Sequence, residues 1–265
     1  MGDAPDPTTD VPRPAPQPLT AAQHVWAFLG ELTGVVVGAV VVAFLLRAFV
    51  GQLFLIPSAS MEQTLRVDDR VVVEKISRLQ RGEVVVFADP GGWLSGPPAP
   101  ERGAVGRALE LVGVLPDSGT EHLVKRLVGL PGDEVVCCDD RGRVSVNGHP
   151  LDETSYLDVV PGGGQVQPST IAFTVTVPAG RIFVLGDNRE RSRDSRCHLH
   201  DRRPGEPEGA AAFVPEDLVV GRAIAVTWPV GHARWLPIPA TVDAVPAAAA
   251  APAQAAIDAG PEASC

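Results

Sequence analysis

The segment Leu32–Leu46 has the sequence LTGVVVGAVVVAFLL and contains no charged residue. The apolar character continues on both sides of it. A helix needs about 20 residues to cross the hydrocarbon layer of a bilayer. Val25–Phe49 meets this length if Glu31 and Arg47 lie near the two interfaces, where long side chains reach water. We therefore predict a transmembrane helix over residues 25–50.

Three interpretations of this apolar run compete: a membrane anchor, a cleavable signal peptide and the core helix of a soluble protein. The preceding residues carry Asp3, Asp6 and Asp10 but only one basic residue, Arg13. A secretory signal needs a basic start and has a shorter apolar region. The pattern favours the anchor, with the lipid bilayer as a partner.

The orientation of the helix is a point of conflict. Arg47, Arg66, Arg70 and Lys75 follow the apolar run, whereas Arg13 stands nearly alone before it. Counted locally, the positive-inside rule places the larger domain in the cytoplasm, but that rule is weak for long translocated domains. We give more weight to the function inferred below, which requires the extracytoplasmic side.

Both ends of the chain have the composition of disordered segments. Residues 1–24 are rich in proline and small polar residues and show no apolar period. Residues 240–265 are rich in alanine and proline, and the prolines are too frequent for a second transmembrane helix. Such segments do not bury enough apolar surface to offset the entropy of ordering.

The region between them, residues 51–239, is predicted to be mostly β. It holds runs of β-branched residues, each bounded by turn residues: 70–76, 83–88, 122–130, 133–137, 143–146, 171–177, 181–185 and 218–227. Their spacing favours antiparallel sheets or a partly closed barrel. Three segments rich in glycine, proline or charge are expected to be surface insertions: 90–120, 161–169 and 201–212.

Charge and cysteine content exclude several classes of function. The formal net charge is −10 and no basic cluster is present, so we expect no nucleic-acid partner. The cysteines are Cys137, Cys138, Cys197 and Cys265, and no pair has the spacing of a zinc site. Because a bond between adjacent cysteines is strained, we expect at most one of Cys137 and Cys138 to pair with a distant cysteine, and we favour buried or spare thiols for all four.

A possible nucleophile follows the apolar run directly, in the segment Ile56–Leu65 (IPSASMEQTL). Ser58 and Ser60 flank an alanine after a proline that restricts the backbone. An active serine needs a base close by and donors aimed at the developing oxyanion. Serine pairs are also common in polar loops, so this motif alone does not identify an active site.

A possible base lies in the segment Leu123–Asp133 (LVKRLVGLPGD). In a strand, Lys125 shares a face with Leu123 and Leu127, and Arg126 lies on the opposite face. Burial lowers the pKa of a lysine and favours the neutral amine, which can accept a proton from a serine. An edge lysine whose ammonium reaches solvent would fit the same pattern.

Two further segments are unremarkable by themselves. Gly186–Arg196 (GDNRERSRDSR) has the composition of a solvated turn, and Arg81–Phe87 (RGEVVVF) is a plain strand. Taken in order, however, the four segments resemble the bacterial type I signal peptidases, whose pattern is an anchor, PSxSMxPTL, RGDxVVF, KRxxGLPGD and GDNRxxSxDSR. The resemblance extends from about Glu31 to Trp228.

This resemblance implies a serine endopeptidase with a serine/lysine dyad. Ser60 falls on the family's nucleophile and Lys125 on its general base, and Ser58 matches the hydroxyl that completes the oxyanion hole with the Ser60 N–H. The substrates implied are preproteins whose signal peptides are removed after small residues (Ala-x-Ala). The family uses no metal and no cofactor.

The same resemblance assigns supporting roles. Ser192 matches the serine that hydrogen-bonds and orients the lysine. Asp194 and Arg196 match residues that hold the architecture of the site, and we expect Arg126 to pair with Asp194. Departures are Gln63 in place of the family's proline, Arg191 in place of the common asparagine, and the inserted region after Cys197; Glu190 keeps only the acidic type.

Three rival hypotheses remain to be tested. A self-cleaving repressor-like protease would need a DNA-binding domain where this chain has its apolar run. A degenerate family member could serve as a membrane-bound scaffold, although Ser58, Ser60, Lys125 and Ser192 are all present. A histidine base is poorly supported, because His122 is three residues from Lys125 and so lies on the other face of a strand.

Overall fold

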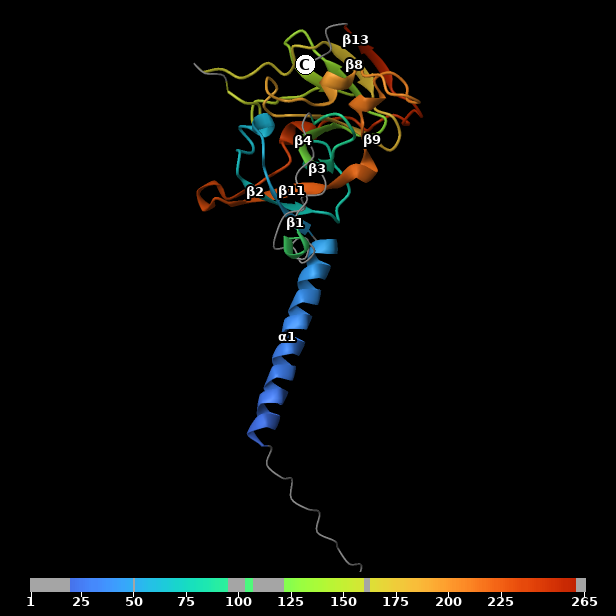
Figure 1. Ribbon diagram of the computed structural model, residues 1–265. Helices are drawn as coiled ribbons and strands as arrows, with labels where there is room; N and C mark the ends of the chain where they lie inside the picture. The colour runs from blue at the N-terminus through green and yellow to red at the C-terminus, as the bar shows by residue number, and fades with distance from the viewer. Residues whose placement is uncertain (1–19, 50, 95–102, 107–121, 160–162, 261–265) are drawn as a thin grey trace, which may run out of the picture. The chain divides into compact units, whose positions relative to one another are not determined.

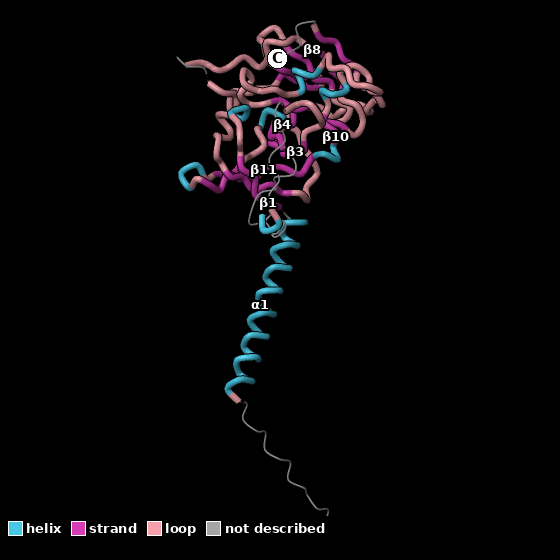
Figure 2. The backbone as a smooth tube through the Cα atoms, in the orientation of Figure 1, coloured by secondary structure: helices cyan, strands magenta, loops and turns pink. Residues whose placement is uncertain are grey.

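The computed structural model describes residues 20–49, 51–94, 103–106, 122–159 and 163–260 (Figure 1). The chain divides into two compact units, Met1–Val42 and Ala43–Cys265. Figure 2 shows one long helix, α1, and then a region made of strands and connecting loops. The predicted mostly β class with one N-terminal apolar helix is confirmed.

The helix α1 covers Ala21–Phe49 and begins four residues earlier than predicted. Thr20 explains the earlier start: its N–H donates to Gln23 Oε1 (2.8 Å), and the Gln23 N–H donates to Thr20 Oγ1 (3.4 Å). This reciprocal pair is a capping box. Residues 21–24, which we expected in the disordered tail, are therefore helical, whereas 1–19 lie outside the described residues.

The span Ala21–Leu45 is long and apolar enough to cross a membrane, and none of it is buried in the structure. A core helix of this composition would bury most of its side chains. The structure thus favours a membrane segment over the core-helix interpretation.

The larger sheet is antiparallel and has the order β1-β2-β11-β3-β4-β9-β10, with β12 paired to β11. Its strands are β1 Gly51–Leu55, β2 Arg70–Glu74, β3 Val84–Ala88, β4 His122–Gly129, β9 Arg181–Leu185, β10 Val214–Pro215, β11 Val219–Trp228 and β12 Arg234–Trp235. Lys125 on β4 lies opposite Val85 on β3.

The smaller sheet, also antiparallel, has the order β13-β8-β5-β6-β7. Its strands are β5 Glu134–Cys137, β6 Val144–Val146, β7 His149–Pro150, β8 Phe173–Thr176 and β13 Ala256–Ala259. Each predicted β run coincides with a strand of one of the two sheets. Neither strand order returns to its first strand among the described residues, so the sheets are open and the partly closed barrel is not observed.

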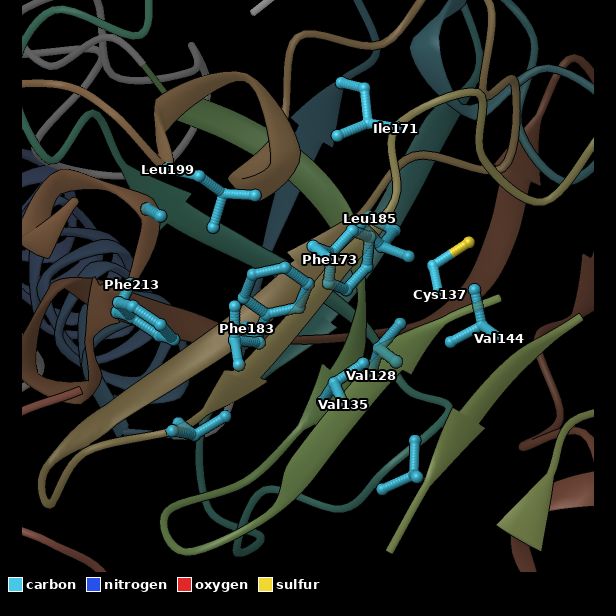
Figure 3. Close-up of a cluster of buried hydrophobic side chains, with 14 of the residues drawn as sticks. Val128, Val135, Cys137, Val144, Ile171, Phe173, Phe183, Leu185, Leu199 and Phe213 are labelled. Carbon is cyan, nitrogen blue, oxygen red and sulfur yellow. The ribbon is translucent and has the colours of Figure 1, made fainter. Parts of the chain in front are cut away.

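A hydrophobic cluster joins the two sheets (Figure 3). Phe183 on β9 lies between Phe173 on β8 and Phe213, with ring centroids 5.5 and 5.7 Å away. Replacing such a buried phenylalanine by alanine typically destabilises a protein by about 3–5 kcal/mol. This packing holds β9, and with it the loop that begins at Gly186, in a fixed place beside β4.

The alanine- and proline-rich segment after residue 240 is ordered as far as Gly260, so the prediction of disorder is wrong there. After the 3₁₀ turn Ala240–Val242, β13 pairs with β8. Pro252 O accepts the Ala179 N–H (2.9 Å), and Ile257 packs against the cluster of Figure 3. Composition misses this because the neighbouring strand supplies the pairing. Residues 261–265 lie outside the described residues.

The expected surface insertions are partly internal. Asp201–Ala212 ends in a 3₁₀ turn, Ala210–Ala212, in which Ala211 and Ala212 are buried. Val166 and Ser169 of the second insertion are also buried. Of Pro90–Thr120, the structure describes 90–94 and 103–106, and Trp93 is fully buried.

The cysteine prediction also needs correction. Cys137 and Cys138 are bonded to each other, and the peptide bond between them is cis. Cys197 is likewise disulfide-bonded.

Candidate active site

The segment carrying Ser60 is a 3₁₀ turn, Ala59–Met61, that follows β1. The Ile56 N–H donates to Asp69 O, and Ile56 O accepts the Asp68 N–H, both at 2.9 Å. Ile56, Met61 and Leu65 are buried below the turn. These apolar anchors hold Ser60 in place while its hydroxyl faces a cleft.

Lys125 reaches the same hydroxyl from β4, and its Nζ lies 2.7 Å from Ser60 Oγ. The lysine is only 3% exposed. Burial lowers its pKa to about 8, with a contribution in the same direction from Arg196, whereas Asp194 and Asp187 oppose the shift. A lysine with this pKa is partly neutral near pH 8, and the neutral amine can accept a proton from a serine.

The cleft has a volume of about 270 Å³. Ser58 is on its wall, with its Oγ 3.4 Å from Ser60 Oγ. The other lining residues are mainly apolar: Ile56, Pro57, Met61, Leu94, His122, Leu123 and Val124, with Ser60 and Lys125. The His122 ring lies edge-on to Phe54, with centroids 5.1 Å apart.

Ser192 is buried close to Ser60, but its hydroxyl forms no hydrogen bond among the described residues. The expected hydrogen bond to Lys125 is therefore absent from this structure. A Cβ placed on Gly186 would lie 2.1 Å from Ser192 Oγ and 2.6 Å from Ser60 O. Only glycine at position 186 permits this approach.

Asp194 and Arg196 form a buried ion pair behind the site. Arg196 Nε donates to Asp194 Oδ1 (2.8 Å), and the Gly186 N–H donates to Asp194 Oδ2 (3.0 Å). Burial raises the pKa of Asp194, but Arg196 and the Gly186 N–H outweigh it and lower the pKa to about 2. Arg196 also donates to Arg189 O (2.9 Å). The pair thus ties the start of the loop to its end.

The expected pairing of Arg126 with Asp194 is wrong. Arg126 instead holds Asp187 through two hydrogen bonds, Nε to Oδ1 (2.7 Å) and Nη2 to Oδ2 (2.6 Å). It also donates to Gly82 O (2.6 Å), and its guanidinium lies 4.1 Å from the ring centroid of Tyr156. Asp194 is already occupied by Arg196, and successive residues of β4 point to opposite faces.

Asp187 had no role in the sequence analysis, nor had a second group beside the site, Glu153, Tyr156 and Arg189. Arg189 forms a buried ion pair with Glu153 and donates from Nε to Gly186 O (2.7 Å). The Tyr156 hydroxyl donates to Glu153 Oε1 (2.9 Å). Glu153 lies in no recognisable motif, and the one available signal was that a buried arginine needs a carboxylate partner.

Gln63, which replaces the family's proline, has a φ of +78°. Proline is restricted to a φ near −65°, so the turn after Ser60 has a conformation that proline would not allow. Asn188 stabilises this turn from the other side, because its N–H donates to Ser60 O (3.1 Å).

In the described part of the chain, no cluster of three or more His, Cys, Asp or Glu side chains could hold a metal.

Comparison with known proteins places this geometry in context. The family model described as "Signal peptidase, peptidase S26" matches residues 29–228. "Signal peptidase I" of Mycobacterium tuberculosis is 36% identical over 254 residues, which cover 88% of this chain and 80% of that protein.

Two further relatives have nearly the same sequence identity to this chain. "Probable signal peptidase I" of Mycobacterium leprae is 35% identical and covers 78% of each chain. "Probable signal peptidase I-2" of Synechocystis is 35% identical and covers 78% of this chain and 76% of that one. A solved signal peptidase I of Enterococcus faecalis is 21% identical, with a TM-score of 0.27, and the match covers 56% of this chain and 98% of that one. The sequence matches show that this chain belongs to the signal peptidase family, peptidase S26.

Proposed function

We propose that this chain is a membrane-bound serine endopeptidase that removes signal peptides from exported preproteins, with Ser60 as nucleophile and Lys125 as general base. The observation that carries the proposal is the 2.7 Å contact between Lys125 Nζ and Ser60 Oγ in a buried setting. The match of residues 29–228 to the family model, and of 88% of this chain to a signal peptidase I, supports the same conclusion.

The reaction follows from this contact. Neutral Lys125 takes the proton of the Ser60 hydroxyl as Oγ attacks the carbonyl carbon before the scissile bond. The Ser58 hydroxyl and the Ser60 N–H stabilise the oxyanion. Lys125 then gives its proton to the leaving amine, which departs as the new N-terminus of the mature protein. Water, deprotonated by Lys125, hydrolyses the acyl-enzyme and restores Ser60.

The substrate is expected to bind as an added strand. Residues His122–Lys125 pair with β3 along one edge, whereas β9 pairs with β4 only from Arg126 onward. The other edge of His122–Lys125 is thus open among the described strands, and these residues line the cleft. An extended peptide can pair with such an edge while its side chains enter the cleft. The small, mainly apolar cleft suits alanine-sized side chains before the cut.

The location of the catalytic unit also forms part of the proposal. Leu53, Leu55, Trp228 and Trp235 are large apolar side chains that are exposed. The strand register aligns Leu53 with Trp235, and Leu55 with Trp228, across β2 and β11. Such an exposed apolar face, beginning a few residues after α1, suits the surface of a bilayer. We place it on the extracytoplasmic side, where exported preproteins emerge. The acidic net charge argues against a nucleic-acid partner.

Turnover of a preprotein by the purified full-length protein in phospholipid vesicles tests the proposal. Mass spectrometry should find cleavage at the signal-peptide junction, and Ser60→Ala should abolish it. Stable binding of the preprotein without cleavage would instead support a scaffold role. Cleavage of this chain alone would support a self-cleaving protease.

A second experiment tests the orientation. Protease added outside intact spheroplasts should digest the catalytic unit if it lies outside the cytoplasm. Protection until lysis would contradict the proposed location and agree with the local positive-inside count.

A further inference from the structure

The cleft beside Ser60 has two wall residues outside the four family segments: His122, which directly precedes one of them on β4, and Leu94, which lies in the β3–β4 connection. Leu94 lines the cleft together with Ser60 and Lys125, and 39% of its surface is exposed. An apolar side chain in this position restricts the size of whatever enters the cleft.

The backbone that carries Leu94 is held in place locally. The Asp89 carboxylate accepts the N–H groups of Gly91 (3.0 Å), Trp93 (3.2 Å) and Leu94 (3.4 Å). The turn is therefore organised by one side chain that satisfies three backbone donors.

Trp93 anchors this turn in the protein interior. Its side chain is 1% exposed and packs with Phe87, Leu123 and Leu127 in a buried cluster. Trp93 Nε1–H donates to Ala211 O (2.9 Å), and its ring stacks on His198 at 4.6 Å with an interplanar angle of 10°. A buried tryptophan with its N–H satisfied is a strong positional anchor.

The anchor depends on the region after Cys197, where this chain departs from the family pattern. Ala211 and His198 come from that region, and Arg203 donates to Pro90 O (2.9 Å) and to Gly91 O. His198 is itself held by Asp201, with Nδ1 2.6 Å from Oδ2. Two segments outside the family pattern therefore meet and together support one wall of the cleft.

We propose that Leu94 is a specificity-determining residue, positioned by Trp93, that limits the size of the substrate side chain accepted at one of the two small positions before the cut. This inference rests on the proposed function. One methylene more or less in an apolar pocket changes discrimination by about 10–200-fold, so a leucine in the wall is enough to separate alanine from a larger residue.

The test measures kcat/KM with peptides that carry Ala-x-Ala, and with peptides in which either alanine is replaced by valine or leucine. Leu94→Ala should raise the ratio of large-residue to alanine cleavage by about tenfold or more at one position. Leu94→Phe should lower that ratio. Ile76→Ala is the matched control, because Ile76 is exposed and does not line the cleft.

The same ratio is also measured as peptide affinity in the Ser60→Ala background, which reports the size of the cleft without turnover. Absence of cleavage by the wild type would refute the proposed function, while the affinities still decide the role of Leu94. Ratios within about threefold of the wild type in both Leu94 variants and in both readouts would overturn the inference.

A further variant tests the positioning role of Trp93. Trp93→Phe keeps an aromatic ring but loses the donor to Ala211 O, and it should broaden the accepted size less than Leu94→Ala does. A specificity identical to wild type, in a protein whose melting temperature has fallen, would show that Trp93 is only structural.

Discussion

Lys125 and Arg126 are adjacent cations on β4, and each is only 3% exposed. No carboxylate among the described residues forms an ion pair with Lys125, and burial lowers its pKa to about 8. Burial acts on Arg126 in the same direction, but the charge and hydrogen bonds of Asp187 outweigh it and raise its pKa. Tyr156 and Gly82 O complete the surroundings of the guanidinium.

The difference between the two faces of β4 shows how one strand serves chemistry and stability together. On one face, an incompletely compensated cation becomes a base that can be neutral at moderate pH. On the other, a fully paired cation stays charged and ties β4 to the loop that begins at Gly186. Loss of Lys125 should therefore affect activity, and loss of Arg126 should affect stability.

The largest effect is expected at Lys125. Lys125→Arg should lower kcat/KM by about 10⁴-fold or more, because guanidinium does not give up its proton near neutral pH. Peptide turnover measures this loss. Lys125→Met should be equally inactive yet more stable at pH 7, by about 1–3 kcal/mol, since it removes a buried ammonium. An active Lys125→Arg variant would refute the dyad.

The next effect concerns stability. Arg126→Met should lower the free energy of unfolding by about 3–5 kcal/mol, because it leaves the Asp187 carboxylate buried without its partner. Denaturant unfolding followed by circular dichroism in detergent measures it. The double variant Arg126→Met/Asp187→Asn should recover much of the loss. If the double variant is no more stable than the single one, the Arg126–Asp187 pair is not the cause.

Replacing Ser58 tests the catalytic role of the cleft beside Lys125, and its expected effect is smaller. Ser58→Ala should lower kcat by about 10²–10³-fold, the usual loss for one oxyanion donor, with little change in KM or melting temperature. Ser145→Ala, on β6 of the smaller sheet, is the matched control. Wild-type turnover of Ser58→Ala would remove Ser58 from the mechanism.

The smallest effect is the pH dependence. With a peptide free of titrating groups, kcat/KM should rise about tenfold per pH unit and level off above the Lys125 pKa of about 8. The rise follows from the neutral amine being the active form. A limb near pH 6.5 would point to a histidine instead.

The lowered pKa of Lys125 also makes the free energy of unfolding depend on pH, in a direction that can be checked. Below pH 8 the folded and unfolded chains both carry the Lys125 proton, so the folded state bears the full burial penalty. As pH rises from about 8 to 10.5, the folded chain releases the proton first and the penalty disappears. The stability advantage of Lys125→Met should therefore shrink over this range, as denaturant titrations at several pH values would show.

Much of the fold could be predicted from local pattern. The apolar run before Phe49 and the β-branched runs coincide with α1 and the strands because they reflect periods of hydrophobicity within a few residues. The start of α1 was missed, although Thr20 and Gln23 carry the capping-box spacing. The order of the C-terminal segment was missed because its strand, β13, is only four residues long within an alanine- and proline-rich stretch and depends on β8 for pairing.

The apolar segment, the mostly β domain and the residue types of the candidate dyad could be read from the amino-acid sequence, because each is a short-range pattern or a motif in a fixed order. The tertiary structure decided what those residues experience. Ser60 and Lys125, and Arg126 and Asp187, are more than 60 residues apart in each case. Whether a lysine is desolvated, or an arginine finds its carboxylate, depends on strands and loops that meet only after folding. The position of Leu94 in the cleft wall also depends on tertiary structure, because the neighbouring Trp93 is held by Ala211 from a distant part of the chain.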